Sequence, residues 1–522
     1  MIDARDLPDN QRMQAEVCIV GGGAAGIALA IELVATGIDV LLIESGGVGS
    51  NREADALNVG TVVDERLHPP LEQNRRRQFG GSISKRESRC TAFTAIELEM
   101  RRYVPESGWP LTGDMLAPYY ARAMRLCESD ESAQTQERDA LMAQSPLVPG
   151  FRPEHFDSAS IDHYGPLVDF GKRYGRQIAG ATNVCVLSHA TVTRIQLNRG
   201  GTAVEGLVVR TEGGRTIQIK SRQFVLAAGT LENARLLLAS RDVHRNGIGN
   251  DNDNVGRYLM CPLQGAIGTV QLTEPPNAIW YGHARDAGGI RSRRRMTLSD
   301  DTQRRLQIGQ FAVRLRHPTV DSVTGNKLGL SHLLPRLMPG RQTRFRIDWQ
   351  AEQQPNPSSR VMLGSTVDAT GVPTLRADWN CNVADFKTVR RGVNLFREAL
   401  RRSGAGSFDH DPAALSAMIT CHGDQGNHHV GTTRMGTDRR SSVVDADCRV
   451  HGVDNLYVAG ASVFPTSGLG DPMLTVTALS IRLGERLKRQ EQRVVTLTPR
   501  TAENWTSNVQ PLFGHNSQVA RR

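Results

Sequence analysis

Three histidines near the C-terminal end of the chain are best suited to proton transfer near neutral pH: His422, His428 and His429. A neutral imidazole can accept a proton in that range, so each is a candidate general base. A hydrogen bond to a loop carbonyl would also explain a histidine, and we favour that structural interpretation for His422 and His429. His429 remains a candidate substrate contact.

Asp471 is a further candidate for this chemistry, and Pro472 follows it. Asp at the N-cap and Pro at the first helical position are favoured at a helix start, and a helical pattern runs from 473 to about 487. Asp471 could be a cap only, or an ionised carboxylate that raises the pKa of a nearby histidine. It could also be protonated, or be the base itself. We expect a direct role in the chemistry, in addition to capping.

Near the N-terminus, the order of elements is typical of a dinucleotide-binding unit. An apolar run at 16–20 predicts a buried parallel strand, and a glycine-rich turn at 21–26 follows it. A helical pattern then ends near Gly37, and a second apolar run at 40–43 leads to Glu44.

Each part of this unit has a physical role. Gly21 permits the tight turn, Gly23 lets the backbone approach a pyrophosphate, and Gly26 lets the helix pack on the strand. The helix N-terminus attracts phosphate, and Glu44 can accept hydrogen bonds from ribose hydroxyls. The unit alone does not distinguish FAD from NAD.

Later segments predict a return to the same sheet. Strands are expected at 224–228 and 456–459, and each is followed by a glycine, Gly229 or Gly460. Between them, 345–350 alternates apolar and polar residues, and 360–363 is a shorter candidate strand of the same second domain. We therefore expect an α/β protein whose nucleotide-binding domain is built from discontinuous segments, with a largely antiparallel sheet in an inserted domain.

The chain resembles the glucose–methanol–choline (GMC) oxidoreductase family over nearly its full length. The resemblance rests on four segments: VGGGAAG at 20–26 with Glu44, AAGTLENARLLL at 227–238, HHVGTTRMG at 428–436, and NLYVAGASVFPTSGLGDPMLTVTAL at 455–479. It implies FAD, a substrate domain with a sheet over the flavin, and oxidation of alcohols that include sugars. Within the family, the chain is similar to bacterial pyranose and glycoside oxidases and dehydrogenases.

The resemblance also assigns the site. In the pattern H-x-x-G-T, the first histidine faces the flavin, and Gly431-Thr432 place His428 there as the base. Asp471 stands where relatives carry Asn or His. The residues expected to contact FAD come from the turns described above and from neighbouring loops: Gly21, Gly23, Ala24, Ala25, Gly26, Glu44, Ser45, Gly81, Ser82, Val192, Ala228, Gly229, Asn233, Gly460, Ala461, Asp471, Pro472 and Met473.

The chain departs from the family pattern at several positions. No histidine stands in the loop 80–87, where relatives with covalent flavin carry one, so we expect noncovalent FAD. His429 occupies a position where a proline or another residue is common. Met260-Cys261-Pro262 stands where relatives often have an acid and a histidine.

The expected domains follow from these segments. The FAD-binding domain comprises 1–70, 160–261 and 411–490, a flavin-covering cap 71–159, the substrate-binding domain 262–410, and a polar tail 491–522. The expected reaction is oxidation of CH–OH to C=O, with a sugar, glycoside or related secondary alcohol as substrate. The alternatives are a flavin-dependent lyase or tailoring enzyme acting on a non-sugar natural product, and a flavoprotein that no longer turns over. Oxygen, a quinone or a protein could each accept the electrons.

Composition and charge limit the other classes of function that the chain could have. The net charge of +9 comes mostly from arginine, with basic clusters at 75–77 and 293–295. We interpret these clusters as solvated surface rather than a nucleic-acid site, although 75–77 could face a cofactor phosphate. No apolar run approaches the roughly 18 residues of a membrane span, and no signal peptide is apparent. The eight scattered cysteines include no CxxC pair, so we expect reduced thiols, no metal site and a cytoplasmic location.

Overall fold

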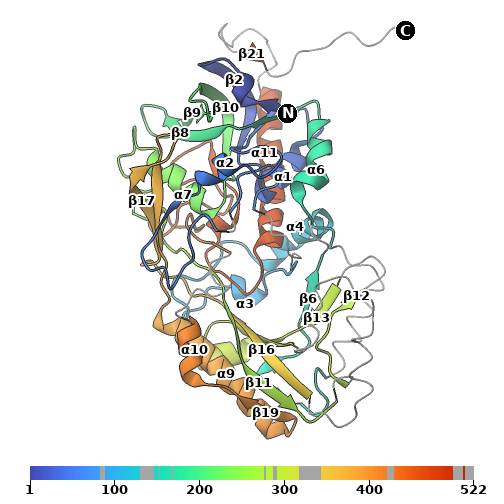
Figure 1. Ribbon diagram of the computed structural model, residues 1–522. Coiled ribbons are helices and arrows are strands. Elements are labelled where there is room, and N and C mark those ends of the chain that lie inside the picture. The colour runs from blue at the N-terminus through green and yellow to red at the C-terminus, as the bar shows by residue number, and fades with distance from the viewer. Residues whose placement is uncertain are drawn as a thin grey trace, which may run out of the picture.

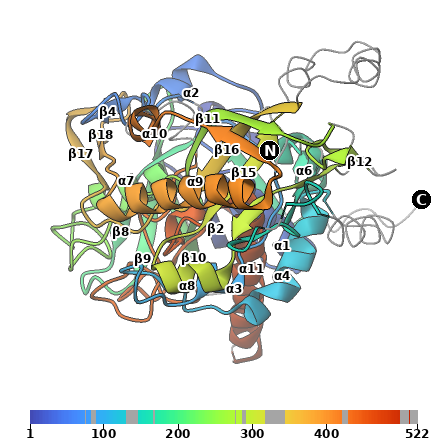
Figure 2. The same ribbon diagram turned by 90° about the horizontal axis from the view of Figure 1, so that it is seen from below.

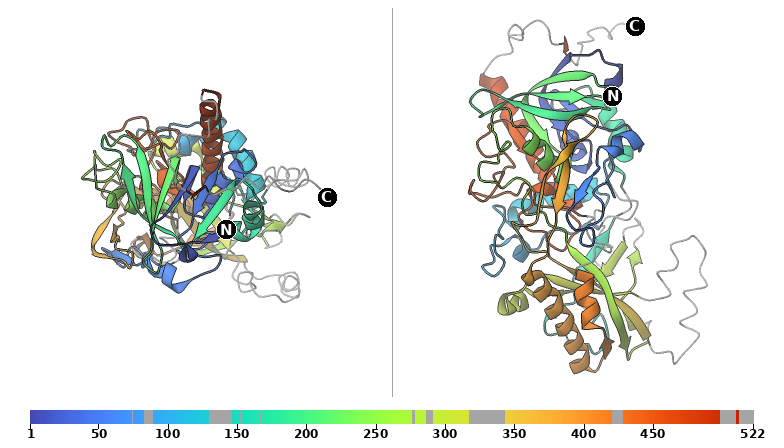
Figure 3. Two further views of the ribbon diagram at one scale, coloured as in Figure 1. Left: turned by 90° about the horizontal axis from the view of Figure 1, so that it is seen from above. Right: turned by 60° about the vertical axis from the view of Figure 1, so that its left-hand side comes forward.

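The computed structural model describes residues 1–73, 75–82, 89–129, 146–151, 153–165, 168–275, 278–285, 291–316, 343–419, 428–497 and 510–511. Two large sheets lie toward opposite ends of the molecule (Figure 1; Figure 3, right). The N-terminus lies at the end that holds the larger sheet.

The larger sheet has nine strands, and its central part is parallel. Its strands are β1 (Ile2–Asp3), β2 (Gln11–Val20), β3 (Val40–Ile43), β7 (Val184–Ser188), β8 (Thr191–Leu197), β9 (Val204–Arg210), β10 (Thr216–Leu226), β20 (Leu456–Val458) and β21 (Gln510–Pro511). The order is β1-β7-β3-β2-β10-β9-β8, and β20 also pairs with β10. Segments more than 400 residues apart therefore share one sheet, which confirms the discontinuous FAD-binding fold.

Helices cover this sheet because their apolar faces need a partner. α1 (Ala24–Leu33) packs against α6 (Phe170–Ala179) and α11 (Met473–Leu497), and α11 also packs against α4 (Gly113–Leu126). α7 (Thr230–Ala239) follows β10, as the sequence predicts. α1 ends at Leu33, four residues before the expected end at Gly37, and α11 runs ten residues past the expected end at 487.

The second sheet has six strands, and each neighbouring pair is antiparallel. Its order is β19 (Gly406–Asp409), β11 (Leu263–Leu272), β16 (Thr343–Ala351), β15 (Phe311–Arg316), β14 (Met296–Leu298) and β5 (Phe156–Asp157). On β16, Phe345, Ile347 and Trp349 are buried, and Gly392 of α9 (Val383–Ser403) packs on Phe311 of β15. α9 lies across this sheet (Figure 2), so the polar side chains of β16 point to the other face.

Two small sheets complete the strand pairing. One joins β12 (Ala284–Arg285), β13 (Arg291–Arg294) and β6 (Ile161–Tyr164). The other joins β17 (Arg360–Val367), β18 (Pro373–Asp378) and β4 (Gly60–Val62), and β17 packs against α7. The short helices are η1 (Ala4–Asp6), α2 (Arg52–Ala56), α3 (Ala95–Leu98), α8 (Asp300–Leu306), α10 (Pro412–Ile419) and η4 (Ala461–Val463).

These pairings correct the expected position of one strand and suggest new domain boundaries. Residues 360–363 form a strand, but it pairs with β18 and not with the six-stranded sheet, so placing it in the second domain's sheet is wrong. β5 and β6 pair with β14 and β13, and α10 packs on β11. We propose to assign 156–164 and 411–419 to the substrate domain, and 360–378 to the FAD-binding domain.

The interpretation of the two arginine clusters as solvated surface is wrong for four of their six residues, whereas the Arg76 side chain is 50% exposed. Arg75 and Arg77 are largely buried and both pair with Glu232. In the second cluster, Arg294 and Arg295 are buried. The charges of these four arginines therefore lie inside the fold and cannot bind a polyanion at the surface. Among the described residues, no helix is both long and apolar enough to cross a membrane.

Candidate active site

The turn after β2 is shaped by two glycines that leave no room for a side chain. Gly21 has φ +109°, and a Cβ there would lie 2.4 Å from the carbonyl oxygen of Ala227. A Cβ at Gly26 would lie 1.9 Å from the carbonyl oxygen of Gly21. These contacts let α1 start directly above the carboxyl ends of β2 and β10.

Gly23 is different, because the space beside it is open. It is the N-cap of α1 and makes no side-chain capping bond. A Cβ at Gly23 would have only Gly81 Cα nearby, at 3.9 Å. The first N–H groups of a helix have no partner within the helix, so those of Ala24 and Ala25 can bind an anion. An open cradle of backbone N–H groups fits the pyrophosphate of FAD.

Glu44 lies at the carboxyl end of β3 and is buried. Its two carboxylate oxygens accept hydrogen bonds from the N–H groups of Gly22 and Gly46, each at 2.8 Å. These bonds fix the carboxylate beside the glycine turn. Oε1 also accepts from the Ser45 hydroxyl at 3.4 Å, so Oε2 is the oxygen that keeps a lone pair with which a ribose hydroxyl can bond.

Asn233 connects the two later returns to the sheet. Its Oδ1 accepts from the N–H of Ala228, and its Nδ2 donates to the Ala459 carbonyl and the Ser462 hydroxyl. Both amide hydrogens are used inside the protein, so its side chain has no donor left for FAD. We therefore assign Asn233 a positioning role for the turns at Gly229 and Gly460, which have φ values of +90° and +108°.

The other residues expected to contact FAD lie on several loops and strands. Ser45 follows Glu44, and Arg77 Nη1 donates to its hydroxyl at 3.3 Å. The Ser82 hydroxyl accepts from the N–H of Arg76 at 2.8 Å, and Val192 lies on β8. Ala461 starts η4, and its carbonyl accepts from Gly431 N–H. Residues 83–87 and His422 lie outside the described residues.

The loop that carries His428 is held by backbone bonds on both sides. Val430 and Met260 exchange N–H···O bonds at 2.9 and 3.0 Å. Gly431 has φ +95°, and a Cβ there would lie 2.3 Å from the Tyr258 carbonyl oxygen. The Thr432 hydroxyl donates to the Thr230 carbonyl at 2.6 Å. The glycine and threonine of H-x-x-G-T thus fix the position of the histidine.

His428 and Asp471 lie close together at an accessible position. His428 Nε2 is 3.6 Å from Asp471 Oδ1, and the two side chains are 40% and 26% exposed. The structure therefore brings together the two residues that the sequence selects for catalysis, although they are 43 positions apart.

Arg89 also contacts Asp471, and no sequence motif indicated that it belongs to the site. Its backbone N–H donates to Asp471 Oδ2 at 3.3 Å, and its Nη2 lies 3.4 Å from Asp471 Oδ1. Its Nη1 donates to Gln350 Oε1 at 2.6 Å, and Gln350 donates in turn to Gln264. Asp471 and His428 therefore lie beside the polar face of the six-stranded sheet.

The buried carboxylate of Asp162 interacts with three arginines on the polar face of the six-stranded sheet. Asp162 accepts from Arg314 at 2.5 Å and lies 3.1 Å from Arg295 and 3.8 Å from Arg89. Burial would raise the pKa of Asp162, but the three guanidinium groups lower it below its ordinary value. These three arginines therefore share the Asp162 carboxylate, and Arg89 also pairs with Asp471.

Asp471 is ionised in this setting. Burial alone would raise the pKa of its carboxyl, but Arg89, with His428 and Arg314 adding to the effect, lowers that pKa below its ordinary value. A protonated Asp471 that imitates asparagine is therefore not supported.

The expected capping role of Asp471 is also not what the structure shows. α11 begins at Met473, and the Val476 N–H donates to the Pro472 carbonyl, so Pro472 takes the N-cap position. The Asp471 carboxylate bonds to Arg89 instead of the helix N–H groups.

His429 points to a different group of residues. Its Nε2 is 2.7 Å from Nε2 of His68, and the two rings are stacked with centroids 5.0 Å apart. Burial, with His68 beside it, lowers the pKa of His429 well below its ordinary value. A ring nitrogen of each histidine and Cys261 Sγ lie within 4.8 Å of one another. Nothing in the local sequence around His68 indicates this cluster.

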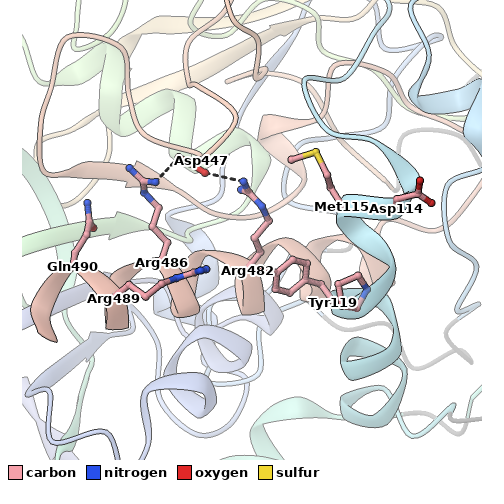
Figure 4. A pocket seen from close by; sticks show the side chains of 9 residues that line it. Asp114, Met115, Tyr119, Asp447, Arg482, Arg486, Arg489 and Gln490 are labelled. Carbon is pink, nitrogen blue, oxygen red and sulfur yellow. Dashed lines mark hydrogen bonds and ion pairs between the residues drawn. The ribbon is translucent and has the colours of Figure 1, made fainter. Parts of the chain in front are cut away.

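A pocket of about 590 Å³ lies elsewhere, between α4 and α11. Arg482, Arg486 and Arg489 line it from one face of α11, with Tyr119 of α4 opposite (Figure 4). Arg482 and Arg486 both pair with Asp447. None of the residues that surround His428 lines this pocket, and we assign the pocket no role in the reaction.

Comparison with known proteins agrees with this arrangement. Residues 16–350 match the FAD dependent oxidoreductase family, and residues 355–480 match the family described as GMC oxidoreductase. Paromamine 6'-oxidase of Streptomyces fradiae is 24% identical, over 92% of this chain and 92% of its own length. C-glycoside 3-oxidase of Microbacterium trichothecenolyticum is 24% identical, over 90% of this chain and 95% of its own.

A solved structure shares the fold. A formate oxidase variant from Aspergillus oryzae RIB40, studied for modification of its FAD, superposes with a TM-score of 0.60 at 16% identity, over 94% of this chain and 100% of that chain. The fold, the dinucleotide turn and the matches define an FAD-dependent oxidoreductase that acts on CH–OH groups. The chain belongs to the GMC oxidoreductase family.

Proposed function

We propose that this enzyme oxidises a sugar, glycoside or related secondary alcohol, with His428 as the general base. The observation that carries the proposal is the placement of His428 Nε2, 3.6 Å from an ionised Asp471 and accessible at the polar face of the six-stranded sheet. The relatives named paromamine 6'-oxidase and C-glycoside 3-oxidase support a sugar-bearing substrate.

The side chains suit such a substrate. Gln264 and Gln350, which are only partly buried, offer donors and acceptors beside His428, as recognition of several hydroxyl groups requires. FAD, when bound at the glycine turn, supplies the hydride acceptor. Nε2 of His428 takes the hydroxyl proton, and Asp471 stabilises the resulting imidazolium. Arg89 holds the Asp471 carboxylate in place.

The test is anaerobic bleaching of the flavin with matched substrate panels. Neutral sugars and C-glycosides should bleach the flavin within the time of mixing experiments, whereas simple alcohols and aromatic natural-product alcohols should not. If only the non-sugar alcohols bleach it, the sugar assignment is wrong and the tailoring alternative is favoured.

We propose that FAD is bound without a covalent link and that the enzyme is cytoplasmic. No histidine stands in the loop 80–87, and the eight cysteines of the sequence include no CxxC pair, which suits a reducing compartment. Acid precipitation should leave the yellow colour in the supernatant. Flavin that stays with the precipitated chain, measured by its absorbance, would contradict the noncovalent assignment.

Replacing Gly23 by Val should weaken FAD binding without unfolding the protein. The added side chain has no close protein contact but would fill the open space beside the first N–H groups of α1. We expect the Kd for FAD to rise about tenfold or more, which corresponds to about 1.4 kcal/mol.

Gly113→Val is the matched control, because Gly113 also stands at a helix start with open space around it. Titration of the apoprotein with FAD, followed by flavin fluorescence, measures both variants. Equal Kd values for the two variants would contradict the assignment of the cradle to the pyrophosphate.

A further inference from the structure

A second cluster of reactive side chains lies next to the loop of His428 but takes no part in the proposed proton transfer. We propose that His68, Cys261 and His429 bind one transition-metal ion of borderline or soft character, and that Zn²⁺ fits the three donors. A ring nitrogen of each histidine and the Cys261 sulfur lie within 4.8 Å of one another.

The donor set and its spacing suit such an ion. Imidazole and thiolate are the ligands that Zn²⁺ prefers in proteins, at about 2.0–2.1 Å for nitrogen and about 2.3 Å for sulfur. Two imidazole nitrogens around one tetrahedral ion lie about 3.3 Å apart. The nitrogens of His68 and His429 are 2.7 Å apart, so they need to separate by about 0.6 Å. A rotation of either ring can provide that movement.

The surroundings already hold the ligands as a metal site requires. His68 Nδ1 is 2.6 Å from the Pro69 carbonyl oxygen, a bond that directs the lone pair of Nε2 toward the cluster. The Cys261 N–H donates to Gln353 Oε1 at 2.7 Å, and the Trp379 indole donates to the same oxygen. His68 and Cys261 are each 1% exposed.

The fold brings the three ligands together from distant parts of the chain. The backbone bridge between Met260 and Val430 places their neighbours Cys261 and His429 side by side, and His68 reaches them from a position 361 residues before His429. Complementary ligands therefore meet at one point in space.

Binding requires no redox step. Cys261 binds as the thiolate and releases its proton to solvent, and the imidazoles bind through neutral nitrogens. The proton that the two Nε2 atoms share moves to Nδ1 of His429. The ion would then tie the turn at His68 to the backbone that carries His428.

The competing explanation is a hydrogen bond between the two imidazoles with Cys261 as an inert neighbour. To distinguish them, the holoenzyme is treated with a chelator, mixed with one equivalent of Zn²⁺ or Co²⁺ and passed through a desalting column. Metal is counted by mass spectrometry, and Co²⁺ is observed in the red, where oxidised flavin does not absorb. We expect about one ion per chain and intense tetrahedral Co²⁺ bands.

Cys261→Ser and His68→Gln should each raise the metal Kd tenfold or more. Cys448→Ser, which changes another buried cysteine away from the cluster, should leave it unchanged. Retention below one-tenth of an ion per chain by the unchanged enzyme would overturn the proposal, as would equal retention by all variants.

X-ray absorption of the Zn²⁺-loaded enzyme tests the proposal even if a variant fails to fold. We expect one sulfur and two imidazole nitrogens around the ion. A first shell without sulfur would overturn the assignment.

Discussion

His428→Ala should retain FAD and lose about 10²-fold or more in the rate of flavin reduction by substrate, the usual contribution of a positioned acid–base group. The side chain is 40% exposed, so its removal opens no cavity in the core. Thermal stability should therefore change little, and the loss in rate should report the chemistry. Anaerobic stopped-flow absorbance measures the rate.

His429→Ala is the comparison, because the two histidines are adjacent in sequence but differ in surroundings. Nε2 of His429 bonds to His68, away from Asp471. We expect a loss in rate of less than about tenfold. If the order of the two effects is reversed, the base is His429 and the assignment from the H-x-x-G-T pattern is one residue out of register.

The parts of the fold that follow local rules are those that the sequence predicts well. The expected strand at 40–43 and the start of the helix after the glycine turn agree with β3 and α1. The strand and the helix start can be predicted because a few consecutive residues determine them. The turn can be predicted because the spacing of its glycines is a known motif, although the contact that requires Gly21 is with Ala227, more than 200 positions away.

Features that depend on distant partners could not be predicted in this way. The strand expected at 360–363 is present as the first half of β17, but its sheet depends on β18 and β4, and β4 lies 300 residues earlier. Arg89 belongs to no motif, and its role appears only when Asp471, Asp162 and Gln350 surround it. A hydrophobic pattern carries no information on which buried arginine meets which carboxylate.

Asp471 shows how dependence on a distant partner limits the prediction of a candidate catalytic residue's role. Asp followed by Pro is the signature of a helix start, and the helix does start there. The carboxylate nevertheless bonds to Arg89, because an ion pair with a buried guanidinium is stronger than a bond to a helix N–H group.

Asp471→Asn should lower the rate of flavin reduction by about 10²-fold. Proton transfer to Nε2 of His428 creates an imidazolium, and the carboxylate of Asp471 lies 3.6 Å from that nitrogen. An ionised carboxylate stabilises this positive charge as it forms, and the neutral amide of asparagine does not. The loss should therefore appear in the reduction step and not in the retention of FAD.

Asp447→Asn is the matched control, because Asp447 also lies between two arginines but far from His428. It should leave the rate unchanged. Stopped-flow reduction, with the substrate found in the bleaching screen, measures both variants. A faster rate in Asp471→Asn would mean that the carboxylate only opposes reduction. An unchanged rate would show that Asp471 serves to hold Arg89 and takes no part in proton transfer. Thermal unfolding of the same variants distinguishes an electrostatic role from loss of packing, because a packing defect lowers the melting temperature as well as the rate.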